Sequence, residues 1–360
     1  MTDLDYMDRA LFLAARGRGR TSPNPMVGAV VVSPDGVIVG QGFHERAGKP
    51  HAEVQALGMA GTRARGATLY CTLEPCCHQG RTGPCGPRIV EAGISRVVAA
   101  TIDPNPVVDG RGVSYLRAQG VDVEVGLRQS AAIRLNQPFF TLTREGRPFV
   151  ILKAATSLDG CIARTAGERT ELTSAAANRH AHGVRAEVDA IGVGVGTILC
   201  DDPLLTARGV YREGPLIRVI FDRRLRTPPS SRVLSTLDAG PVMIVTEAAA
   251  AARVEVRRPL EDRGAEIDVM RDGSFGAALE RLAARQVGSL LLEGGAALHA
   301  SAWDENLVDY VRLYVTPHII GPDGLKLLDR RRFSSAALLE PRVEPLGPDV
   351  LIEGYVHGPR

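Results

Sequence analysis

Two stretches decide how the first half of this chain folds: HAE at residues 51–53 and TLEPCCHQGRTGPC at residues 72–85. Histidine nitrogen and cysteine sulfur are preferred ligands of Zn²⁺, and three protein ligands leave the fourth tetrahedral position open for water. We predict that His51, Cys76 and Cys85 are those three ligands. Loops must therefore bring the two stretches together around one ion.

A carboxylate beside these ligands favours a catalytic zinc site over a structural one. Glu53 stands two residues after the histidine, where it can move a proton between the water and a substrate nitrogen without binding the metal. A structural site would normally close with a fourth ligand, and Cys77 and His78 are the alternatives for that role, but such a site has no use for Glu53. Cys76 is preferred to its neighbour because a proline precedes it.

The ligands also predict the local structure around them. His51 and Glu53 would diverge by about 200° in the middle of a helix, so both can face one site only from its first turn. A strand at residues 67–71 is expected to deliver the first cysteine to the same place. The helix after the second cysteine is predicted to end at Gly93. The partial positive charge of its amino terminus would help to keep a thiolate ionised.

Alternation of apolar periodicities predicts strands and helices in turn through the rest of this half. Asn24, in the rigid proline loop 21–25, could present its amide to a base edge, although a turn-forming asparagine is an equally good interpretation. Because strands alternate with helices, we predict a layered α/β domain whose loops at one sheet edge form the site. The predicted elements are a helix at 6–15, a hairpin at 29–39, a helix from 51 to 57, and a strand at 96–100 followed by a loop at 103–106.

Composition restricts the class of protein. With 360 residues the chain is longer than one core usually grows, so two domains are expected. Contents of 44% hydrophobic and 23% charged residues are ordinary for a globular enzyme. A net charge of +2 and an aromatic content of 4% argue against nucleic-acid binding. No apolar run approaches the roughly 18 residues that a membrane span needs, so no membrane partner is expected.

Cysteine usage and the amino terminus indicate the compartment. The six cysteines do not form the dense pattern of a secreted disulfide framework, and three of them stand at metal spacing, which suits a reducing cytoplasm. Residues 1–5 are acidic and lack the apolar run of a signal peptide. We therefore expect a cytoplasmic protein.

The second half predicts a separate α/β unit. The polar, breaker-rich passage 127–148 is interpreted as the seam, which gives domains at residues 1–146 and 147–360. The segment 310–315 alternates as an edge or half-buried strand. An interface between copies is possible there, and we expect a homo-oligomer, either a dimer or a tetramer. The other predicted elements are strands at 149–152, 190–193, 216–221, 242–245 and 289–292, and helices at 174–186 and 275–282.

Two glycine-rich turns in the second half could hold phosphates. GVGVGT at residues 192–197 follows a strand but lacks the context of a dinucleotide-binding motif. EGG at residues 293–295 lies between a strand and a helix that begins near Ala296, where glycine permits close approach and free helix amides bind phosphate. A simple strand-to-helix turn explains the second stretch equally well.

The first half resembles the deaminase domain of the bifunctional riboflavin-biosynthesis deaminase/reductase family. The stretches that carry the resemblance are PNP (23–25), HAE (51–53), the run 72–85, DPNP (103–106) and GRG (110–112). His-x-Glu, Pro-Cys and a further cysteine form the pattern of zinc-dependent nucleobase deaminases. Cytidine and tRNA adenosine deaminases space their cysteines as Pro-Cys-x-x-Cys, whereas eight residues separate Cys76 from Cys85, as in the riboflavin family. The resemblance implies a cytidine-deaminase-like, three-layer α/β/α domain.

The second half resembles the reductase domain of the same family, which has a dihydrofolate-reductase-like α/β fold and uses NADPH. The matching positions are Lys153, SLDG (157–160), Gly167-Glu168, Arg185, Thr197, DDPLLT (201–206), Arg208 and EGG (293–295). The predicted substrate contacts are Asn24, Arg169, Arg185, Leu205, Arg208 and Glu293. The predicted cofactor contacts are Ala155, Thr197, Asp201, Arg223 and the turn Gly295, Ala296, Ala297, Leu298, His299, Ala300 and Ser301. Arginine forks suit a ribose phosphate.

Two stretches depart from the family pattern. Residues 169–173, RTELT, stand where many relatives carry a small polar residue and an aromatic near a Trp-Ile-Thr run. Arg223-Arg224 replaces a smaller residue after the strand that ends at Phe221-Asp222. Arg223 could favour the 2′-phosphate of NADPH, and a solvated arginine is the alternative interpretation.

The resemblance spans almost the whole chain and implies two successive reactions. The first is zinc-dependent hydrolytic deamination of 2,5-diamino-6-ribosylamino-4(3H)-pyrimidinone 5′-phosphate, and the second is NADPH-dependent reduction of its ribosyl group to a ribityl side chain. The expected partner is thus a small phosphorylated pyrimidine. The alternatives are a nucleic-acid base deaminase, which would want a basic channel and stacking aromatics, a zinc-stabilised scaffold in which Glu53→Gln changes nothing, and a deaminase whose second domain binds nucleotide without reducing.

Overall fold

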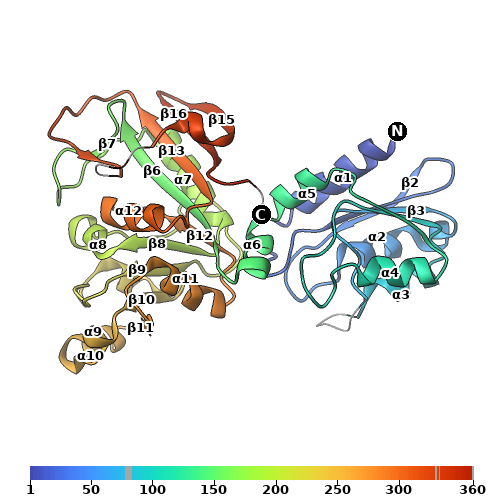
Figure 1. Cartoon of the computed structure of the whole chain (residues 1–360), viewed down its shortest axis with the longest axis horizontal. Helices are drawn as coiled ribbons and strands as arrows, with labels where there is room; N and C mark the ends of the chain where they lie inside the picture. The colour runs from blue at the N-terminus through green and yellow to red at the C-terminus, as the bar shows by residue number, and fades with distance from the viewer. Residues whose placement is uncertain (78–82, 329–330, 332, 359–360) are drawn as a thin grey trace. The chain divides into compact units, whose positions relative to one another are not determined.

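The computed structural model describes residues 1–77, 83–328, 331 and 333–358 (Figure 1). The chain divides into two compact units, Met1–Glu145 and Gly146–Gly358, each with its own sheet and core. The sequence places the domain boundary after residue 146, and the division in the structure falls after residue 145. None of the described helices combines the length and the apolarity that crossing a membrane requires.

A five-stranded sheet in the order β2-β1-β3-β4-β5 organises the first unit. β1 is antiparallel to both β2 and β3, whereas β3, β4 and β5 are parallel. Consequently β2, β3 and β4 all end at the same edge of the sheet. The strands are β1 (Gly28–Val32), β2 (Ile38–Phe43), β3 (Thr68–Cys71), β4 (Arg96–Ala99) and β5 (Asp122–Val125).

Helices cover both faces of this sheet and make three layers (Figure 1). Side chains alternate along each strand, so Val31 joins the core under α2, α3 and α4, while Val30 joins the core under α1 and α5. Gly28 allows α1 to lie against the sheet, because a Cβ atom there would be 2.0 Å from the carbonyl oxygen of Ala10. The helices are α1 (Asp3–Ala15), α2 (Ala52–Ala60), the 3₁₀ turn η1 (Gly61–Ala64), α3 (Cys85–Glu91), α4 (Arg111–Ala118), α5 (Gln129–Leu135) and α6 (Gln137–Glu145).

The passage 127–148, expected as a breaker-rich seam, is mostly helical. It forms α5 and α6, which the break at Asn136 separates. Pro138 stands in the first turn of α6, where its missing N–H costs no helical hydrogen bond. The side chain of Asn136 accepts from the amide of Met26 at 2.7 Å and donates to its carbonyl at 2.9 Å. Polar residues that suggested a linker therefore serve as tertiary hydrogen-bonding groups.

A nine-stranded sheet in the order β11-β10-β9-β8-β12-β6-β13-β16-β15 organises the second unit. Its strands are parallel from β11 through β13, and β16 and β15 continue antiparallel. The strands are β6 (Phe149–Ser157), β8 (Ala190–Gly194), β9 (Ile217–Phe221), β10 (Val242–Thr246), β11 (Ala265–Val269), β12 (Ser289–Leu292), β13 (Tyr310–Thr316), β15 (Leu339–Leu346) and β16 (Asp349–Tyr355), with a separate pair β7 (Cys161–Ala163) and β14 (Leu325–Lys326).

Two cores lie on opposite faces of this sheet. Leu290 packs in one of them with residues of α11 and α12, and its neighbour Leu291 packs in the other with residues of α7, α8 and α10. The helices are α7 (Ala175–Glu187), α8 (Val195–Asp201), α9 (Ala248–Ala251), α10 (Val254–Glu261), α11 (Phe275–Ala284) and α12 (Ala296–Asp304), with 3₁₀ turns η2 (Arg232–Ser235), η3 (Leu237–Ala239) and η4 (Ser335–Ala337).

The sequence predicts an edge or a half-buried strand at residues 310–315, and the structure contradicts the edge strand and agrees with the half-buried one. β13 pairs along its length with β6 on one side and with β16 on the other. Its alternating pattern arises because Tyr310 and Arg312 lie half-buried, while Val311 and Leu313 enter the core. The backbone of β13 is thus unavailable for pairing with another copy, and the outer strand on this side is β15.

A buried ion pair fixes the start of the second unit. Arg147 donates from Nη1 and Nη2 to the two carboxylate oxygens of Asp309, both at 2.7 Å, and the two side chains are 8% and 9% exposed. Asp309 also accepts a hydrogen bond at 2.8 Å from the amide of Val150, the second residue of β6. The bidentate geometry satisfies both charges where water is excluded, and it ties the first strand of the unit to the residue before β13.

Candidate active sites

Loops at one edge of the first sheet gather the predicted zinc ligands. His51 follows β2 and caps the amino terminus of α2, Cys76 follows β3, and Cys85 is the first residue of α3. The amides of Cys85 and of the residue after it donate to the carbonyl oxygen of Cys76 at 3.1 and 3.0 Å. These two hydrogen bonds place the cysteines next to each other although eight residues separate them.

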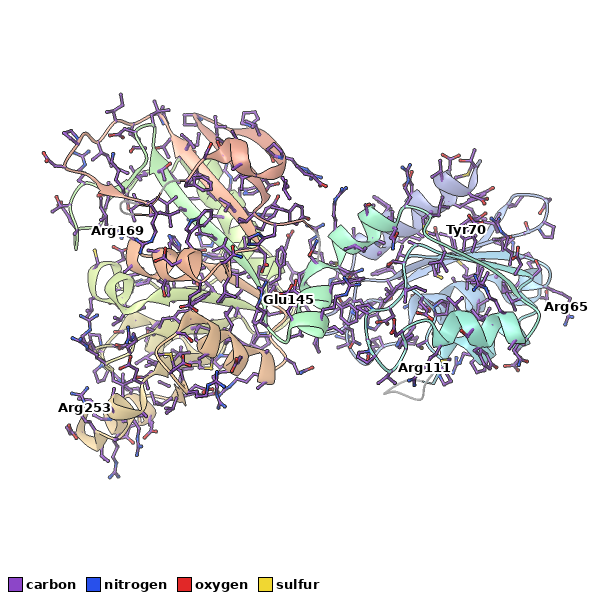
Figure 2. The ribbon with its side chains drawn as sticks, in the orientation of Figure 1. Arg65, Tyr70, Arg111, Glu145, Arg169 and Arg253 are labelled. Atoms are coloured by element: carbon purple, nitrogen blue, oxygen red, sulfur yellow. The ribbon has the colours of Figure 1, made fainter. Side chains whose placement is uncertain are left out.

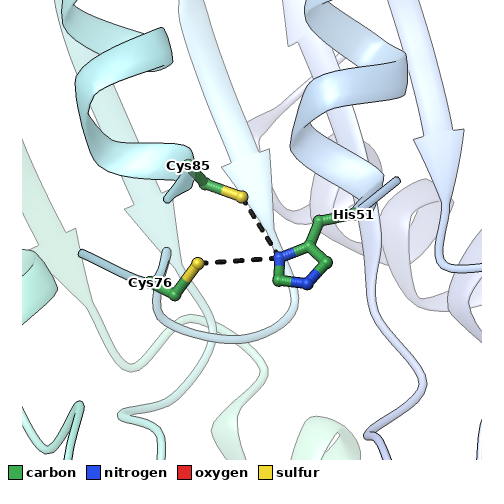
Figure 3. Close-up of side chains that lie close together, drawn as sticks. All are labelled: His51, Cys76 and Cys85. Carbon is green, nitrogen blue, oxygen red and sulfur yellow. Dashed lines mark hydrogen bonds between the residues drawn. The ribbon is translucent and has the colours of Figure 1, made fainter. Parts of the chain in front are cut away.

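The three side chains converge on one point (Figure 3). The sulfur of Cys85 lies 3.3 Å from Nδ1 of His51 and that of Cys76 lies 3.6 Å from it, and all three donor atoms are within 4.8 Å of one another. A tetrahedral zinc with Zn–S of about 2.3 Å and Zn–N of about 2.0–2.1 Å separates sulfur and nitrogen by about 3.6 Å. The donor set and its spacing therefore fit Zn²⁺.

The lowered pKa of one cysteine of this pair also suits the binding of a cation. The hydrogen bond from the thiol of Cys85, together with His51, lowers the pKa of Cys76 to about 4. One of the two sulfurs is thus ready to bind as a thiolate, which is the metal-binding form. Among the described residues, the group of candidate ligands contains these three and not Cys77. His78, the other alternative for a fourth ligand, lies outside the described residues.

Glu53 lies in the first turn of α2, as its predicted role requires. Its side chain is buried, and its nearest polar neighbours include His51 and the thiol of Cys85. Burial is the main cause that raises the pKa of Glu53, and the charge of His51 opposes it. A carboxyl group with a raised pKa, held beside the metal ligands, is suited to accept and return a proton.

Glu74 has a structural part that the sequence did not reveal. Its buried carboxylate accepts from the amides of Asp103 at 3.2 Å, Gly110 at 2.9 Å and Val113 at 3.0 Å. Gly112 lets α4 approach this segment, because a Cβ atom there would be 1.9 Å from the carbonyl oxygen of the residue after Glu74. The GRG stretch thus holds the loop after β4 against the loop that carries Cys76.

His44 was missed in the sequence, where nothing distinguishes it from any other histidine. It is buried, and its Nε2 lies 3.2 Å from Nδ2, the side-chain amide nitrogen, of Asn24. The ring of His44 meets the ring of His51 edge-on, with centroids 5.6 Å apart. Burial lowers the pKa of His44, so it is neutral at neutral pH and can accept from Asn24. The structure therefore connects Asn24 through His44 to His51, one of the predicted zinc ligands.

In the second unit the structure joins two predicted substrate residues in an ion pair. Arg185 of α7 donates from Nε at 2.7 Å and from Nη2 at 2.6 Å to the two oxygens of Glu293, which follows β12. The side chains are 16% and 7% exposed. Burial alone would raise the pKa of Glu293, but Arg185 and Lys153 lower it to about 2. Glu293 is therefore a fixed negative charge that is paired with Arg185 and further stabilised by the charge of Lys153.

The remaining predicted substrate residues of the second unit differ in their exposure and in their partners. Leu205 is buried, and Arg208 is exposed, its amide donating to Nδ1 of His182 at 3.1 Å. Burial and the charges of Arg185 and Arg232 lower the pKa of Arg208, which marks a region of positive potential. Arg169 (labelled in Figure 2), also a predicted substrate contact, lies in the loop between β7 and α7, where its side chain forms an ion pair with Glu171.

Of the predicted cofactor residues, Thr197 and the turn that begins at Gly295 lie together at the carboxyl ends of β8 and β12, whereas Ala155 lies on β6 and Arg223 follows β9. Gly294 lies between β12 and α12 with φ of 137°, a conformation that favours glycine. Its carbonyl accepts from the amide of Gly194 at 2.8 Å, and Cβ atoms built on Gly294 and Gly295 would be 3.7 and 3.6 Å from Oγ1 of Thr197. Two helix amino termini, those of α8 and α12, thus open beside one glycine turn, which suits a pyrophosphate.

Two buried polar atoms nearby lack a hydrogen-bond partner in the described protein. They are Oδ1 of Asp201, at the end of α8, and Nδ1 of His299, in the first turns of α12. Burial lowers the pKa of His299 to about 4, so it stays neutral. Orphaned buried polar atoms call for a partner, and these fit a polar ligand such as a nicotinamide dinucleotide. Ala296, Ala297, Leu298, Ala300 and Ser301 lie on α12, and Ala155 lies on β6 beside β12.

These folds and sites define a class of protein: a two-domain enzyme with a zinc deaminase domain followed by a reductase domain. Residues 1–101 match the family model "Cytidine and deoxycytidylate deaminase zinc-binding region", and residues 148–352 match "RibD C-terminal domain". The chain belongs to the RibD family and is a bifunctional riboflavin-biosynthesis deaminase/reductase. The fold class predicted for both halves is confirmed.

Relatives and solved structures match the chain from end to end. It is 42% identical over 353 residues to the riboflavin biosynthesis protein RibD of Aquifex aeolicus, covering 97% of each chain, and 39% identical to that of Escherichia coli, covering 98% of this chain and 99% of the relative. Among structures, Acinetobacter baumannii RibD has a TM-score of 0.86 at 35% identity with 98% of each chain covered. The deaminase/reductase of Thermotoga maritima has a TM-score of 0.83 at 35% identity with 97% of each covered.

Proposed function

We propose that His51, Cys76 and Cys85 hold Zn²⁺ and that Glu53 carries out proton transfer in hydrolytic deamination. An ion held by these three residues would supply a water with its pKa lowered to about 7. Glu53 would take one proton from such a water and pass it to the ring nitrogen while the water oxygen adds to the amino-bearing ring carbon. It would then pass the second proton to the amino group, so that the C–N bond breaks and ammonia leaves. The observation that carries this proposal is the convergence of one nitrogen and two sulfurs beside a buried carboxyl group.

We further propose that the substrate is 2,5-diamino-6-ribosylamino-4(3H)-pyrimidinone 5′-phosphate and that Asn24, held by His44, meets the pyrimidine edge. An amide can both donate to and accept from a base edge. The printed name of the Thermotoga maritima protein, a diaminohydroxyphosphoribosylaminopyrimidine deaminase, supports this substrate class. A charge of +2 and few aromatic residues do not favour a nucleic-acid strand in its place.

In the second unit we propose that NADPH is the cofactor. It would supply a hydride to the opened ribosyl carbon, and a proton from solvent would complete the ribityl group. Thr197, Asp201, His299 and the turn that begins at Gly295 would hold the cofactor. The fork of Arg185 is already filled by Glu293 and by the carbonyl of Thr206. Arg208, exposed in a region of positive potential, is therefore the better candidate for the substrate phosphate.

A coupled assay tests both halves together. Purified, zinc-loaded protein is supplied with the phosphorylated diaminopyrimidine, with and without NADPH, and ammonia release, NADPH oxidation and product masses are followed. Ammonia without NADPH, and a ribityl product only with it, are expected. Deamination followed by no NADPH oxidation would contradict the reductase proposal and support a nucleotide-binding second domain that does not reduce.

We propose that the protein works in the cytoplasm as a homo-oligomer. All six cysteines lie among the described residues and none of them forms a disulfide, as expected in a reducing compartment. On β15, Leu339 is 46% and Val343 is 68% exposed. Pro341 and Pro345 lack the N–H groups that a continued ladder needs, so a second copy would meet this strand through side chains.

Light scattering of a Val343→Lys variant tests this surface. A lower mass than that of the wild type is expected, because a charge in an apolar contact is costly. Val254→Lys on α10, where the native residue is 50% exposed, is the matched control and should keep the wild-type mass. If the wild-type protein is a monomer, the proposed homo-oligomer is contradicted; if Val343→Lys leaves the oligomer unchanged, the β15 surface is contradicted. Cell fractionation tests the location separately, and recovery of the protein outside the cytoplasmic fraction would contradict it.

A further inference from the structure

The residues proposed above to hold the cofactor leave its adenosine end without an assigned contact, and the sequence left Arg223 open between a contact to the 2′-phosphate and a solvated side chain. In the second sheet the order β12-β8-β9-β10 continues away from the glycine turn, and these strands are parallel. Ligands of open α/β sheets lie outside the carboxyl ends of the strands. A dinucleotide with its pyrophosphate at Gly294-Gly295 and Thr197 therefore extends in one direction over the ends of β9 and β10.

Two oppositely charged side chains stand at those strand ends. Arg223 comes two residues after β9 and Glu247 directly after β10, and Nε of Arg223 forms an ion pair with Oε1 of Glu247. Their backbones are also joined, because the amide of Glu247 donates to the carbonyl of Arg223 at 3.3 Å. The side chains are 65% and 34% exposed, so both can reach a ligand on the surface.

The surrounding chain holds this pair in place. Asp222, buried before Arg223, accepts from the amide of Thr227 at 2.7 Å and from its hydroxyl at 2.8 Å, which fixes the turn. The guanidinium lies against Gly273, where a Cβ atom would be 2.7 Å from Nη2. The neighbouring charge Asp272 is engaged by Ser274 and Arg271. Arg223 is thus a positioned group rather than a free surface side chain.

We propose that Arg223 and Glu247 together distinguish NADPH from NADH. The guanidinium fork binds the 2′-phosphate of the adenosine ribose in place of its bond to Glu247. Glu247, like the acidic residue of dinucleotide folds, accepts instead from an unphosphorylated 2′-hydroxyl. The inference rests on the proposed reductase function, and adds to it the two residues that set cofactor choice and an internal competitor for the phosphate.

Nucleotide binding measures this without any turnover. Isothermal titration of the full-length, zinc-loaded protein with 2′,5′-ADP and with 5′-AMP is expected to favour 2′,5′-ADP by about tenfold or more. Arg223→Ala should weaken 2′,5′-ADP by about that factor and leave 5′-AMP within about twofold. Glu247→Gln, which removes the competitor, should strengthen 2′,5′-ADP roughly threefold and weaken 5′-AMP, which loses the acceptor of its 2′-hydroxyl.

Controls separate the possible failures. An exposed ion pair contributes little to stability, so both variants should unfold at the wild-type temperature, and Arg223→Lys should give an intermediate affinity because it keeps the charge and loses the fork. Arg257→Ala, in the exposed Arg257–Glu261 pair of α10, should bind like the wild type. Equal affinity of the wild type for the two nucleotides, or an Arg223→Ala variant that still prefers 2′,5′-ADP, would overturn the inference alone. Binding of neither nucleotide nor NADPH would overturn the proposed cofactor and this inference with it.

Discussion

Replacing Glu53 by glutamine is expected to abolish ammonia release while the protein keeps its zinc. Glutamine preserves the size and the burial of the side chain but cannot take a proton from water and return it to a ring nitrogen. Loss of a general acid–base group costs about 10²–10⁴ in rate. Because the ligands His51, Cys76 and Cys85 are untouched, the metal content by elemental analysis should equal that of the wild type.

Glu91→Gln is the matched control for this experiment. Glu91 ends α3, is exposed, and lies on the helix that begins at Cys85, so the change should leave both the rate and the zinc content unaltered. Retention of more than a tenth of the rate by Glu53→Gln would contradict the assigned role. Loss of zinc from that variant would indicate that Glu53 supports the metal site instead of moving protons.

Replacing Glu293 by glutamine is expected to stop reduction and leave deamination intact. Glu293 is the buried anion between Arg185 and Lys153, and its loss leaves two cations without their partner, which typically costs about 3–5 kcal/mol. NADPH oxidation should fall by at least about a hundredfold. A hundredfold loss of rate corresponds to about 2.7 kcal/mol of activation free energy, which is less than the cost of leaving the two cations unpaired. Ammonia release depends on the other unit and should not change.

A double variant separates lost folding stability from lost chemistry. Arg185→Gln together with Glu293→Gln removes both charges of the pair, so unfolding of the second unit should return toward the wild-type temperature. Reduction should stay absent in the double variant if Glu293 contacts the substrate. Recovery of NADPH oxidation there would show that Glu293 only holds the fold. Glu280→Gln, at an exposed position on α11, serves as the control.

Some features of both sites could be predicted because they are local in the sequence. Metal-ligand types at a given spacing predicted three side chains that the structure brings together, and the carboxyl group two residues after His51 predicted where in α2 it must stand. Apolar periodicity identified β12 and the helix after it, so the glycine turn at 293–295 could be placed at a helix amino terminus.

Other features could not be predicted because their partners are distant or unspecific. Glu74 bonds to backbone amides 29, 36 and 39 residues away, and every residue carries such an amide. Glu293 meets Arg185 across 108 residues, so their pairing depends on β8 and β12 being neighbours. The alternating pattern of β13 left an edge strand and a half-buried strand both open. Its neighbours β15 and β16 follow it in the chain, and β15 includes two prolines that conceal a strand.

The sequence by itself determined the chemistry of the amino-terminal site, the order of the elements and the division into two α/β units, since each depends on residue type and short-range spacing. Tertiary structure alone decided which charges face each other: Arg185 is taken up by Glu293, Arg169 pairs with Glu171, and Arg223 stands beside Glu247. The physical reason is that a charge acts over a few ångströms in space, and only sheet order brings residues far apart in the chain within that distance.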